Sequence, residues 1–344
     1  MKGLVLEKYN EFVWKDVEIP SSGEENVLIR VKACAVCGSD VHGMDGSTGR
    51  RIPPVIMGHE ASGIIEKCGS KVKDYKPGDR VTFDSTIYCG ECEECKNGKF
   101  NLCDNRRVLG VSCEDYRMDG AFAEYISVPE RVLYRLPENV SFVQACMVEP
   151  LSVAYHAVTR TSVRGKACVV VFGVGTIGML TVQVLKSFGV KTVIAVDISS
   201  ARLKMALKYG ADYAIDALDG DVTEQILKLT PYGKGANVCY DATGNSTTLN
   251  NSLKVLKKGG EEVLIGNLEA KTEFPLQWVV TRQISIFASC ASAGEYSQCL
   301  ELISSGKVNV DVLVSKVVPM SEGNEWIKRV YQGEKGLSKI VLVP

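Results

Sequence analysis

The segment ACVVVFGVGTIG (residues 167–178) decides the fold of this 344-residue chain. Its first half, Ala167 to Phe172, is a continuous apolar run of the kind found in strands buried on both faces of a parallel sheet. Glycines then follow at G-x-G-x-x-G spacing, and apolar residues recur at helical spacing from Ile177 to Phe188. Strand, glycine turn and helix in this order predict a dinucleotide site, because the glycines let the backbone approach a pyrophosphate that the helix N-terminus binds.

An acidic residue indicates which dinucleotide is bound. Asp197 follows the next predicted strand, Lys191 to Val196, where a carboxylate accepts hydrogen bonds from both ribose hydroxyls and repels a 2′-phosphate. We therefore predict NAD rather than NADP, although Arg202 nearby complicates this preference. A glycine turn without a ligand is the alternative, and the strand, helix and acid together argue against it. The predicted cofactor-binding residues are Gly173, Gly175, Thr176, Ile177, Gly178, Asp197, Arg202, Thr243, Ile265, Gly266 and Asn267.

The chain changes character on either side of this region. Strand–helix alternation continues through a helix at 201–209 and strands at 238–241 and 262–265, which predicts a doubly wound parallel sheet. Short strands between turn residues precede it, at 26–36, 61–69, 79–83 and 121–129, and indicate an all-β unit. From about Ser289 the pattern is less regular and ends in a strand, Lys339 to Pro344. We expect one domain made of residues 1–152 and 289–344, with an α/β domain of residues 153–288 inserted into it.

Composition narrows the classes of function. The formal net charge is −1, with 45% hydrophobic and 24% charged residues, so overall charge gives no case for nucleic acid or an anionic membrane as partner. Charged residues interrupt every apolar run near the N-terminus, so there is no signal-peptide core. The longest apolar stretch is far below the roughly 18 residues that suggest a membrane span. We expect a cytoplasmic protein that acts on a small molecule.

The chain has 13 cysteines, an odd number, and several of them are clustered, which favours metal binding over disulfides. Cys89, Cys92, Cys95 and Cys103 are spaced so that four thiolates can surround one tetrahedral ion. Zinc prefers such closed four-sulfur sites in structural roles. Four free thiols in a loop are the alternative, and the spacing argues against them. We predict a structural zinc site on the surface, among charged residues.

A second set of candidate ligands lies in the β-rich part. Cys37, His59 and Glu60 are joined by Glu149, which stands where the α/β pattern begins. A cysteine, a histidine and a carboxylate with one open position form a catalytic zinc pattern. Taken singly, Cys37 could be a buried thiol and Glu60 could pair with an arginine. Whether Glu60 or Glu149 binds the metal directly stays open.

These patterns together resemble the zinc-containing medium-chain dehydrogenases. The resemblance rests on the two zinc patterns, Gly58-His59-Glu60, the segment 76–81 (KPGDRV) and the glycine fingerprint, and it covers essentially the whole chain in order. The segments 37–42 (CGSDVH) and 149–153 (EPLSV) are most similar to the sorbitol (L-iditol) and galactitol-1-phosphate dehydrogenase branch. The resemblance implies a GroES-like catalytic domain with an inserted Rossmann domain, two zinc ions per chain and NAD.

The resemblance also implies roles for single residues. Cys37, His59 and Glu60 would be the inner ligands of the catalytic zinc, and Glu149 would bind it directly or through water. Ser39 would receive the substrate's hydroxyl proton, and His42 would pass it outward through the cofactor ribose. A surface histidine without a role is the alternative for His42.

Three segments depart from that branch. Ala291-Ser292 stands where the branch has an Arg-Tyr pair that contacts cofactor and polyol. The loops 45–51 and 106–111 carry the pairs Arg50-Arg51 and Arg106-Arg107. We expect one pair to bind a phosphate or carboxylate of the substrate, because guanidinium groups suit such anions; solvated surface arginines are the alternative.

The predicted function is hydride transfer between a secondary hydroxyl of a polyol, sugar alcohol or its phosphate and NAD. Threonine or simple alcohol oxidation is an alternative within the same chemistry. A non-catalytic nicotinamide-binding protein with structural zinc only is an alternative of another class. The resemblance further implies a homodimer or homotetramer.

Overall fold

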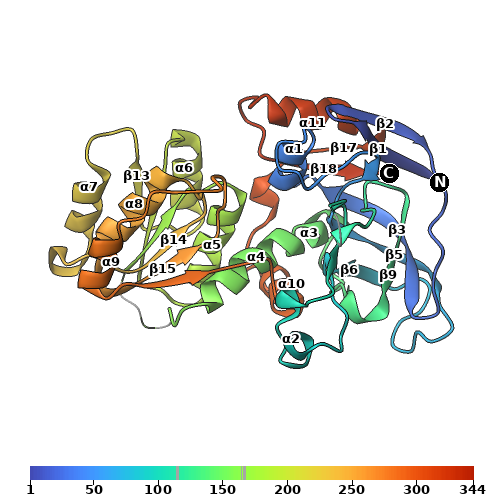
Figure 1. Cartoon of the computed structure of the whole chain (residues 1–344), viewed down its shortest axis with the longest axis horizontal. Helices are drawn as coiled ribbons and strands as arrows, with labels where there is room; N and C mark the ends of the chain where they lie inside the picture. Colours follow the sequence, from blue (N-terminus) through green and yellow to red (C-terminus); the bar gives the residue numbers. More distant parts are fainter. Residues whose placement is uncertain (114–115, 164, 166–167) are drawn as a thin grey trace. The chain divides into compact units, whose positions relative to one another are not determined.

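The computed structural model describes residues 1–113, 116–163, 165 and 168–344, and the chain forms two compact units (Figure 1). Unit 1 contains residues 1–149, 293–305 and 310–344, and unit 2 contains residues 150–292 and 306–309. The boundaries expected from the sequence, 152/153 and 288/289, lie a few residues from those of the structure, and residues 306–309 were not expected in unit 2. Ala167, the expected first residue of the strand before the glycines, lies outside the described residues.

Unit 2 is built on a six-stranded sheet in the order β13-β12-β11-β14-β15-β16, with parallel pairing throughout. The strands are β11 (Cys168–Phe172), β12 (Thr192–Asp197), β13 (Tyr213–Asp216), β14 (Ala236–Asp241), β15 (Leu256–Leu264) and β16 (Ser285–Ala288). The strand order reverses between β11 and β14, and ligands of doubly wound sheets bind at the carboxyl ends of the strands beside such a reversal. The predicted Rossmann architecture is confirmed.

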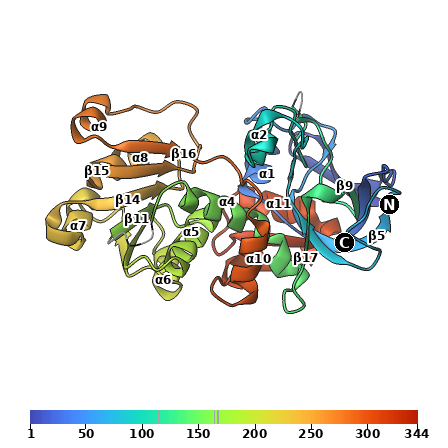
Figure 2. The same ribbon diagram turned by 90° about the horizontal axis from the view of Figure 1, so that it is seen from below.

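Helices cover both faces of this sheet, with α5 and α6 on one face and α8 on the other (Figure 2). They are α4 (Val148–Thr159), which begins in unit 1, α5 (Thr176–Ser187), α6 (Ser200–Lys208), α7 (Val222–Leu229), α8 (Ser246–Val255) and α9 (Leu276–Arg282). All five residues of β11 are buried, as the apolar run predicts. Leu249 and Leu253 of α8 pack with Val170 and Cys239 in the core under one face.

Unit 1 contains a seven-stranded sheet in the order β10-β6-β5-β3-β18-β17, with β9 also paired to β3. A three-stranded sheet β2-β1-β4 and the pair β7-β8 complete its β structure. The strands are β1 (Lys2–Lys8), β2 (Glu11–Asp16), β3 (Asn26–Ala35), β4 (Val55–Ile56), β5 (Glu60–Cys68), β6 (Arg80–Phe83), β7 (Thr86–Ile87), β8 (Arg107–Val108), β9 (Tyr125–Pro129), β10 (Leu133–Arg135), β17 (Val314–Pro319) and β18 (Lys339–Val343). Its helices are α1 (Gly38–Gly43), α2 (Glu93–Lys96), α3 (Phe142–Cys146), α10 (Tyr296–Ser304) and α11 (Gly323–Tyr331).

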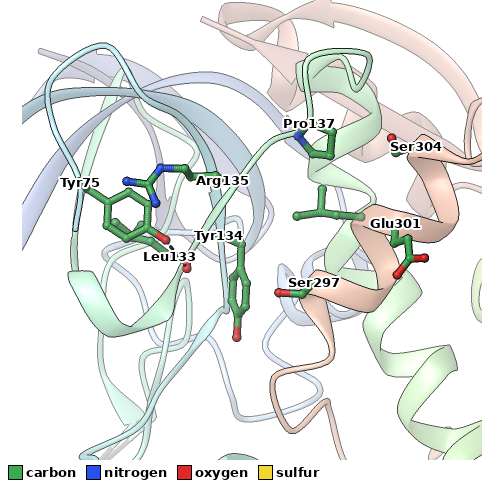
Figure 3. A pocket seen from close by; sticks show the side chains of 9 residues that line it. Tyr75, Leu133, Tyr134, Arg135, Pro137, Ser297, Glu301 and Ser304 are labelled. Carbon is green, nitrogen blue, oxygen red and sulfur yellow. Dashed lines mark hydrogen bonds between the residues drawn. The ribbon is translucent and has the colours of Figure 1, made fainter.

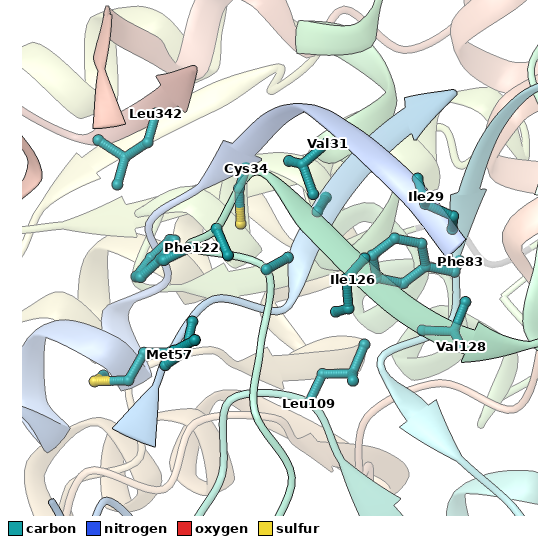
Figure 4. Close-up of a cluster of buried hydrophobic side chains, with 14 of the residues drawn as sticks. Ile29, Val31, Cys34, Met57, Phe83, Leu109, Phe122, Ile126, Val128 and Leu342 are labelled. Carbon is teal, nitrogen blue, oxygen red and sulfur yellow. The ribbon is translucent and has the colours of Figure 1, made fainter. Parts of the chain in front are cut away.

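The core of unit 1 is formed by alternate residues of several strands (Figure 4). Ile29 and Val31 of β3 share this core with Ile126 and Val128 of β9. Leu342 of β18 joins them, so the last strand of the chain packs into the same core as the first 130 residues.

The segment after Ser289, where the sequence pattern is less regular, contains α10, β17 and α11, which were not predicted. The buried residues of α10 are Tyr296, Cys299, Leu300 and Ile303, which is the spacing of one helix face. The helical pattern was therefore present in the sequence. None of the 13 cysteines, all of which the structure describes, forms a disulfide. Within the described residues, no helix has the length and apolar character needed to cross a bilayer.

Glu262 of β15 lies fully buried in unit 2, and this burial raises the pKa of its carboxyl well above the ordinary value of 4.5. The folded protein then keeps a proton that the unfolded chain loses, so Glu262 reduces stability progressively as the pH rises above about 4.5. We expect Glu262→Gln to raise the melting temperature more at pH 8 than at pH 5, by about 2–4 °C for each kcal/mol recovered.

The control is Glu273→Gln at an exposed position of the same unit, which should shift the melting temperature equally little at both pH values. A gain for Glu262→Gln that does not grow with pH would contradict the neutral carboxyl.

Candidate metal and cofactor sites

Three strands of unit 1 bring the first candidate ligands together. In the antiparallel pair β3–β5, Ala35 lies opposite Glu60, so the chain leaving β3 toward Cys37 passes beside His59 and Glu60. In the pair β18–β3, Val341 lies opposite the same Ala35, which brings the start of β18 to this point. Residues near positions 37, 60 and 339 therefore meet because of strand register.

The ligand atoms of Cys37, His59 and Glu60 lie within 4.8 Å of one another. Cys37 is the N-cap of α1, and its sulfur accepts a hydrogen bond from the Ser39 N–H at 3.5 Å. Gly58 has φ +90°, and a Cβ there would lie 2.5 Å from the Phe122 ring. Glycine is thus required before His59 for the chain to turn into β5.

The carboxylate of Glu60 is fully buried and forms an ion pair with Lys339. Lys339 Nζ lies 2.7 Å from each carboxylate oxygen. Burial alone would lower the pKa of Lys339, but the Glu60 carboxylate raises it, so the ammonium stays charged. The negative charge of Glu60 is therefore compensated by a lysine from the last strand of the chain.

Asp40 is a second buried carboxylate at this cluster. It accepts hydrogen bonds from the Cys37 N–H at 3.1 Å and from Arg51 Nη2 at 3.3 Å, and it lies 3.5 Å from His59 Nδ1. Burial would raise its pKa, but His59, Arg51 and the Cys37 N–H lower it to about 2. Asp40 thus lies at ion-pair distance from the His59 ring, and a carboxylate beside a histidine commonly orients the ring when the histidine binds a metal.

Glu149, the fourth expected ligand, lies outside the group formed by Cys37, His59 and Glu60. Its carboxylate accepts a hydrogen bond from the Ser85 hydroxyl at 3.2 Å. Burial and the nearby Glu60 carboxylate raise the pKa of Glu149 to about 7. The side chain is therefore close enough to Glu60 to interact with it electrostatically, but it does not share the compact ligand cluster.

Ser39 and His42 both lie on α1 and are exposed. The Ser39 hydroxyl accepts a hydrogen bond from Arg51 Nη2 at 3.3 Å. Arg51 is only 3% exposed, so it is neither a solvated surface arginine nor a free anion-binding group. The alternative of a solvated surface arginine is therefore wrong for Arg51, whose guanidinium donates to Asp40 and Ser39.

The two residues of the second arginine pair, Arg106 and Arg107, also lie in different surroundings. Arg106 donates to the Asn101 carbonyl and lies over the Tyr116 ring, 5.4 Å from its centroid. Arg107 is exposed at the start of β8. Ser292, at another departure from the family branch, is buried, and Ala291 before it has φ +51°.

The four sulfurs of Cys89, Cys92, Cys95 and Cys103 lie within 4.8 Å of one another. Backbone N–H groups of Glu91 and Cys92 donate to the Cys89 sulfur at 3.5 and 3.4 Å, and these bonds lower the pKa of Cys89 to about 6. Donors of this kind stabilise thiolates, which is the form that binds metal. The expected four-sulfur group is thus assembled around the short helix α2.

In unit 2 the glycine fingerprint adopts the geometry its sequence predicts. Gly173 has φ +77°, and a Cβ on Gly178 would lie 1.8 Å from the Gly173 carbonyl oxygen, so only glycine lets α5 pack on the end of β11. Gly175 is the N-cap of α5, and a Cβ there would meet open space. Thr176 and Ile177 begin the helix. The N-terminus of α5 therefore remains open beside the glycine turn.

Asp197 ends β12 next to this turn and is buried. Its oxygens accept hydrogen bonds from the Val174 N–H at 2.8 Å and the Ser199 N–H at 2.9 Å, and Arg202 Nη1 lies 3.8 Å away. The carboxylate is thus fixed in place by the glycine loop itself.

The remaining predicted cofactor residues follow β14 and β15. A Cβ on Gly244 would lie 2.2 Å from the Gly266 carbonyl carbon, so the turns containing Thr243 and Ile265 to Asn267 are packed against each other. The buried Asp241 holds the first turn by accepting the N–H groups of Thr243 and Gly244.

A groove of about 620 Å³ lies in unit 1 beside β10 and α10 (Figure 3). Tyr134 of β10 lies across from Ser297 of α10, while the guanidinium of Arg135 lies over the Tyr75 ring. None of the residues that line it is a predicted ligand or cofactor residue. The groove is therefore separate from the predicted chemistry.

Asp40, Lys339 and Ser85 have no role in the predictions from sequence, and the burial of Arg51 was not predicted either. Asp40 lies within the segment 37–42 that carried the resemblance, so its position was visible while its contact with His59 was not. Lys339 opens an otherwise apolar strand, KIVLV, and a buried lysine there implies an acidic partner. The identity of that partner depends on register between strands far apart in sequence.

Comparison with known proteins identifies the class. The family model described as the alcohol dehydrogenase GroES-like domain matches residues 23–138, and the one described as zinc-binding dehydrogenase matches residues 176–305. Together with the fold of both units, these matches show that the chain belongs to the zinc-binding medium-chain dehydrogenases. The predicted family and fold class are confirmed, and the chain is an enzyme of the zinc-dependent alcohol dehydrogenase type.

Individual relatives are similar over nearly their whole length. The chain is 36% identical over 347 residues to D-xylulose reductase A of Aspergillus oryzae, covering 98% of this chain and 95% of the relative. It is 31% identical to the sorbitol dehydrogenase of Bacillus subtilis, covering 100% and 97%. A protein of Sinorhizobium meliloti 1021 described as a zinc-binding dehydrogenase, solved with NADP bound, is 30% identical, with a TM-score of 0.91 and coverage of 100% and 99%.

The buried pair of Glu60 and Lys339 makes a direct prediction. In the zinc-free protein, Lys339→Met leaves the Glu60 carboxylate buried without its cation, which costs about 3–5 kcal/mol when one partner of such a pair is removed. We expect urea denaturation to show a loss of this size. The double variant Glu60→Gln/Lys339→Met should lose less, because no unpaired charge remains.

Lys71→Met is the matched control, because Lys71 pairs with Glu24 at the same 2.7 Å but on the surface. It should cost less than about 1 kcal/mol. Equal losses for Lys339→Met and Lys71→Met would show that the buried pair does not carry the stability assigned to it.

Proposed function

We propose that this protein transfers hydride between a secondary hydroxyl of a polyol, sugar alcohol or its phosphate and NAD, with catalytic zinc at Cys37, His59 and Glu60. The observation that carries the proposal is the compact group of these three side chains, with ligand atoms within 4.8 Å of one another. The polyol class is supported by relatives named D-xylulose reductase and sorbitol dehydrogenase.

The chemistry of the donors supports two zinc ions per chain. A thiol, an imidazole and a carboxylate with room for a further ligand suit catalytic zinc, and four thiols suit structural zinc. Cys89, Cys92, Cys95 and Cys103 would hold the structural ion. Glu149 would approach the catalytic ion directly or through water, as an alternative to Glu60.

A bound zinc ion would act as a Lewis acid that lowers the pKa of the substrate hydroxyl. The protein's own residues position the reaction. Asp40 holds the ring of His59, and the exposed Ser39 hydroxyl would accept the substrate's proton. His42, exposed in the last turn of the same helix α1, would pass that proton outward.

We infer NAD as the cofactor because Asp197 presents a buried carboxylate beside the glycine turn, which disfavours a 2′-phosphate. Arg202 is held 3.8 Å from that carboxylate, which reduces its availability for a phosphate. The remaining predicted contacts are Gly173, Gly175, Gly178, Thr176, Ile177, Thr243, Ile265, Gly266 and Asn267.

Two alternatives remain distinct from this proposal. Threonine or a simple alcohol as substrate would leave the metal site and cofactor unchanged. A non-catalytic nicotinamide-binding protein would need only the four-cysteine zinc, and the open group at Cys37, His59 and Glu60 argues against it. We also infer a homodimer or homotetramer, on the basis of the family resemblance.

The decisive test follows NADH absorbance with sorbitol, xylitol, polyol phosphates, inositols, threonine and simple alcohols, before and after chelation. We expect chelator-sensitive NADH formation with one polyol subclass and two zinc ions per chain by elemental analysis. Cys37→Ser should reduce the zinc count to one and abolish turnover, because it removes a ligand of the catalytic ion only.

The outcomes separate the candidates. Turnover of threonine or ethanol alone would replace the polyol substrate. One zinc ion per wild-type chain, with nucleotide binding but no turnover of any alcohol, would instead favour the non-catalytic protein.

Cofactor choice is tested by Asp197→Ser. Loss of the hydrogen bonds that the ribose hydroxyls donate to a charged carboxylate costs about 1.5–3 kcal/mol, so kcat/KM with NAD should fall by about 10- to 100-fold. The NAD-to-NADP ratio of kcat/KM should fall with it, because the repulsion of a 2′-phosphate is also removed.

Asp216→Ser is the matched control, since Asp216 lies opposite Asp197 in the neighbouring strand and also accepts a backbone N–H from its own turn. It should leave the ratio unchanged. A ratio that favours NADP in the wild-type protein would contradict the assignment of NAD.

A further inference from the structure

Arg51 is a buried arginine placed against the residue predicted to receive the substrate's proton. Its Nη2 lies 3.3 Å from the Ser39 hydroxyl and 3.3 Å from Asp40 Oδ1, while the side chain is 3% exposed. Burial of a guanidinium is costly unless it is paired, so this position needs an explanation. The ion pair with Asp40 explains only part of this burial.

The surroundings of Arg51 are built to hold it. A Cβ on Gly43 of α1 would lie 2.6 Å from Arg51 Cγ, so the helix has a glycine where the arginine stem crosses it. Nη1 reaches the Arg50 carbonyl at 3.5 Å. Within the part of the chain that the structure describes, Arg51 Nε is buried and has no hydrogen-bond partner. The arginine is thus kept over α1 although one of its donors is left unsatisfied.

Asp40 needs this cation when His59 binds a metal. A metal-bound histidine is a neutral imidazole whose second N–H faces the carboxylate. Asp40 is fully buried. When His59 is neutral, Arg51 is the cation in contact with the Asp40 carboxylate, and without Arg51 that charge would be unpaired.

The contact with Ser39 has a chemical consequence. A guanidinium only donates hydrogen bonds, so the Ser39 oxygen accepts from Arg51. The hydroxyl must then give its own hydrogen to a different acceptor, and one lone pair stays open for a further donor. Because Ser39 is exposed, a substrate hydroxyl can be that donor.

We propose that Arg51 is a positioning residue of the proton relay, which fixes the Ser39 hydroxyl so that it accepts the substrate's proton and releases its own outward. The O–H bond of the substrate breaks as an O–H bond to Ser39 forms, and the original Ser39 proton passes through the relay to water. Ser39 is unchanged at the end, and a bound nicotinamide would supply the acceptor for the substrate's hydride. This inference rests on the proposed function.

The test is a double-mutant cycle on the holoenzyme with Ser39→Ala, Arg51→Met and the double variant. Arg51→Met should lower kcat by about tenfold or more in the wild-type background, with KM changed by less than about threefold. In the Ser39→Ala background the same substitution should lower kcat by less than about twofold, because the group through which Arg51 acts is already gone. Arg51→Lys should recover part of the loss by restoring a donor.

Two further measurements separate the relay from a structural effect. The spectrum of the cobalt-substituted protein reports the Cys37 ligand, and NADH fluorescence reports cofactor binding; both should stay unchanged in Arg51→Lys, which keeps a cation beside Asp40. Arg30→Met removes an exposed arginine of the same unit and should change kcat by less than about twofold.

Equal losses of kcat in the two backgrounds would overturn the relay role, as would an altered cobalt spectrum in Arg51→Lys, which would mean that residue 51 acts on the metal through Asp40. Wild-type protein that is silent with every alcohol would overturn the proposed function, and the relay with it. If the wild-type enzyme is active and the effects of Ser39→Ala and Arg51→Met on kcat are additive, only the relay role is overturned.

Discussion

A buried charge must be paired, and this constraint shapes the metal cluster of unit 1. Glu60 and Asp40 are both fully buried, and each has its own cation, Lys339 for the first and Arg51 for the second. The two cations come from opposite ends of the chain. The ligand group can be compact because neither carboxylate needs solvent.

The charges of this cluster also indicate what it attracts. The thiolate form of Cys37 with Glu60 and Asp40 carries three negative charges, and Lys339 with Arg51 carries two positive charges, which leaves one negative charge when His59 is neutral. A divalent cation would convert this to one net positive charge. Negative charge on a nearby oxygen, from Glu149 or from a deprotonating alcohol, is then favoured electrostatically.

Local patterns in the sequence were sufficient for the fold class and for most of the site. The glycine fingerprint predicted β11 and α5 because backbone conformation at Gly173 and packing at Gly178 are local properties. The four cysteines were predictable because short spacing alone brings their sulfurs together. Lys339 and the buried position of Arg51 were not predictable, because they depend on strand register and on a crossing with α1. The helix α10 was overlooked although its apolar spacing is regular, because it follows the end of the strand–helix alternation that marks the α/β unit.

The position of Lys339 means that the metal cluster needs both ends of the chain. Its contact with Glu60 spans 279 residues, and it forms only when β18 pairs with β3. Until that pairing, Glu60 has to remain near water, because burying it alone would cost several kcal/mol. The four-cysteine group differs, since Cys89 and Cys103 are only 14 positions apart and the Cys89 thiolate is supported by neighbouring backbone N–H groups. The four-cysteine group can therefore form from a short segment of the chain. The group of Cys37, His59 and Glu60 can be completed only after β18 has paired with β3.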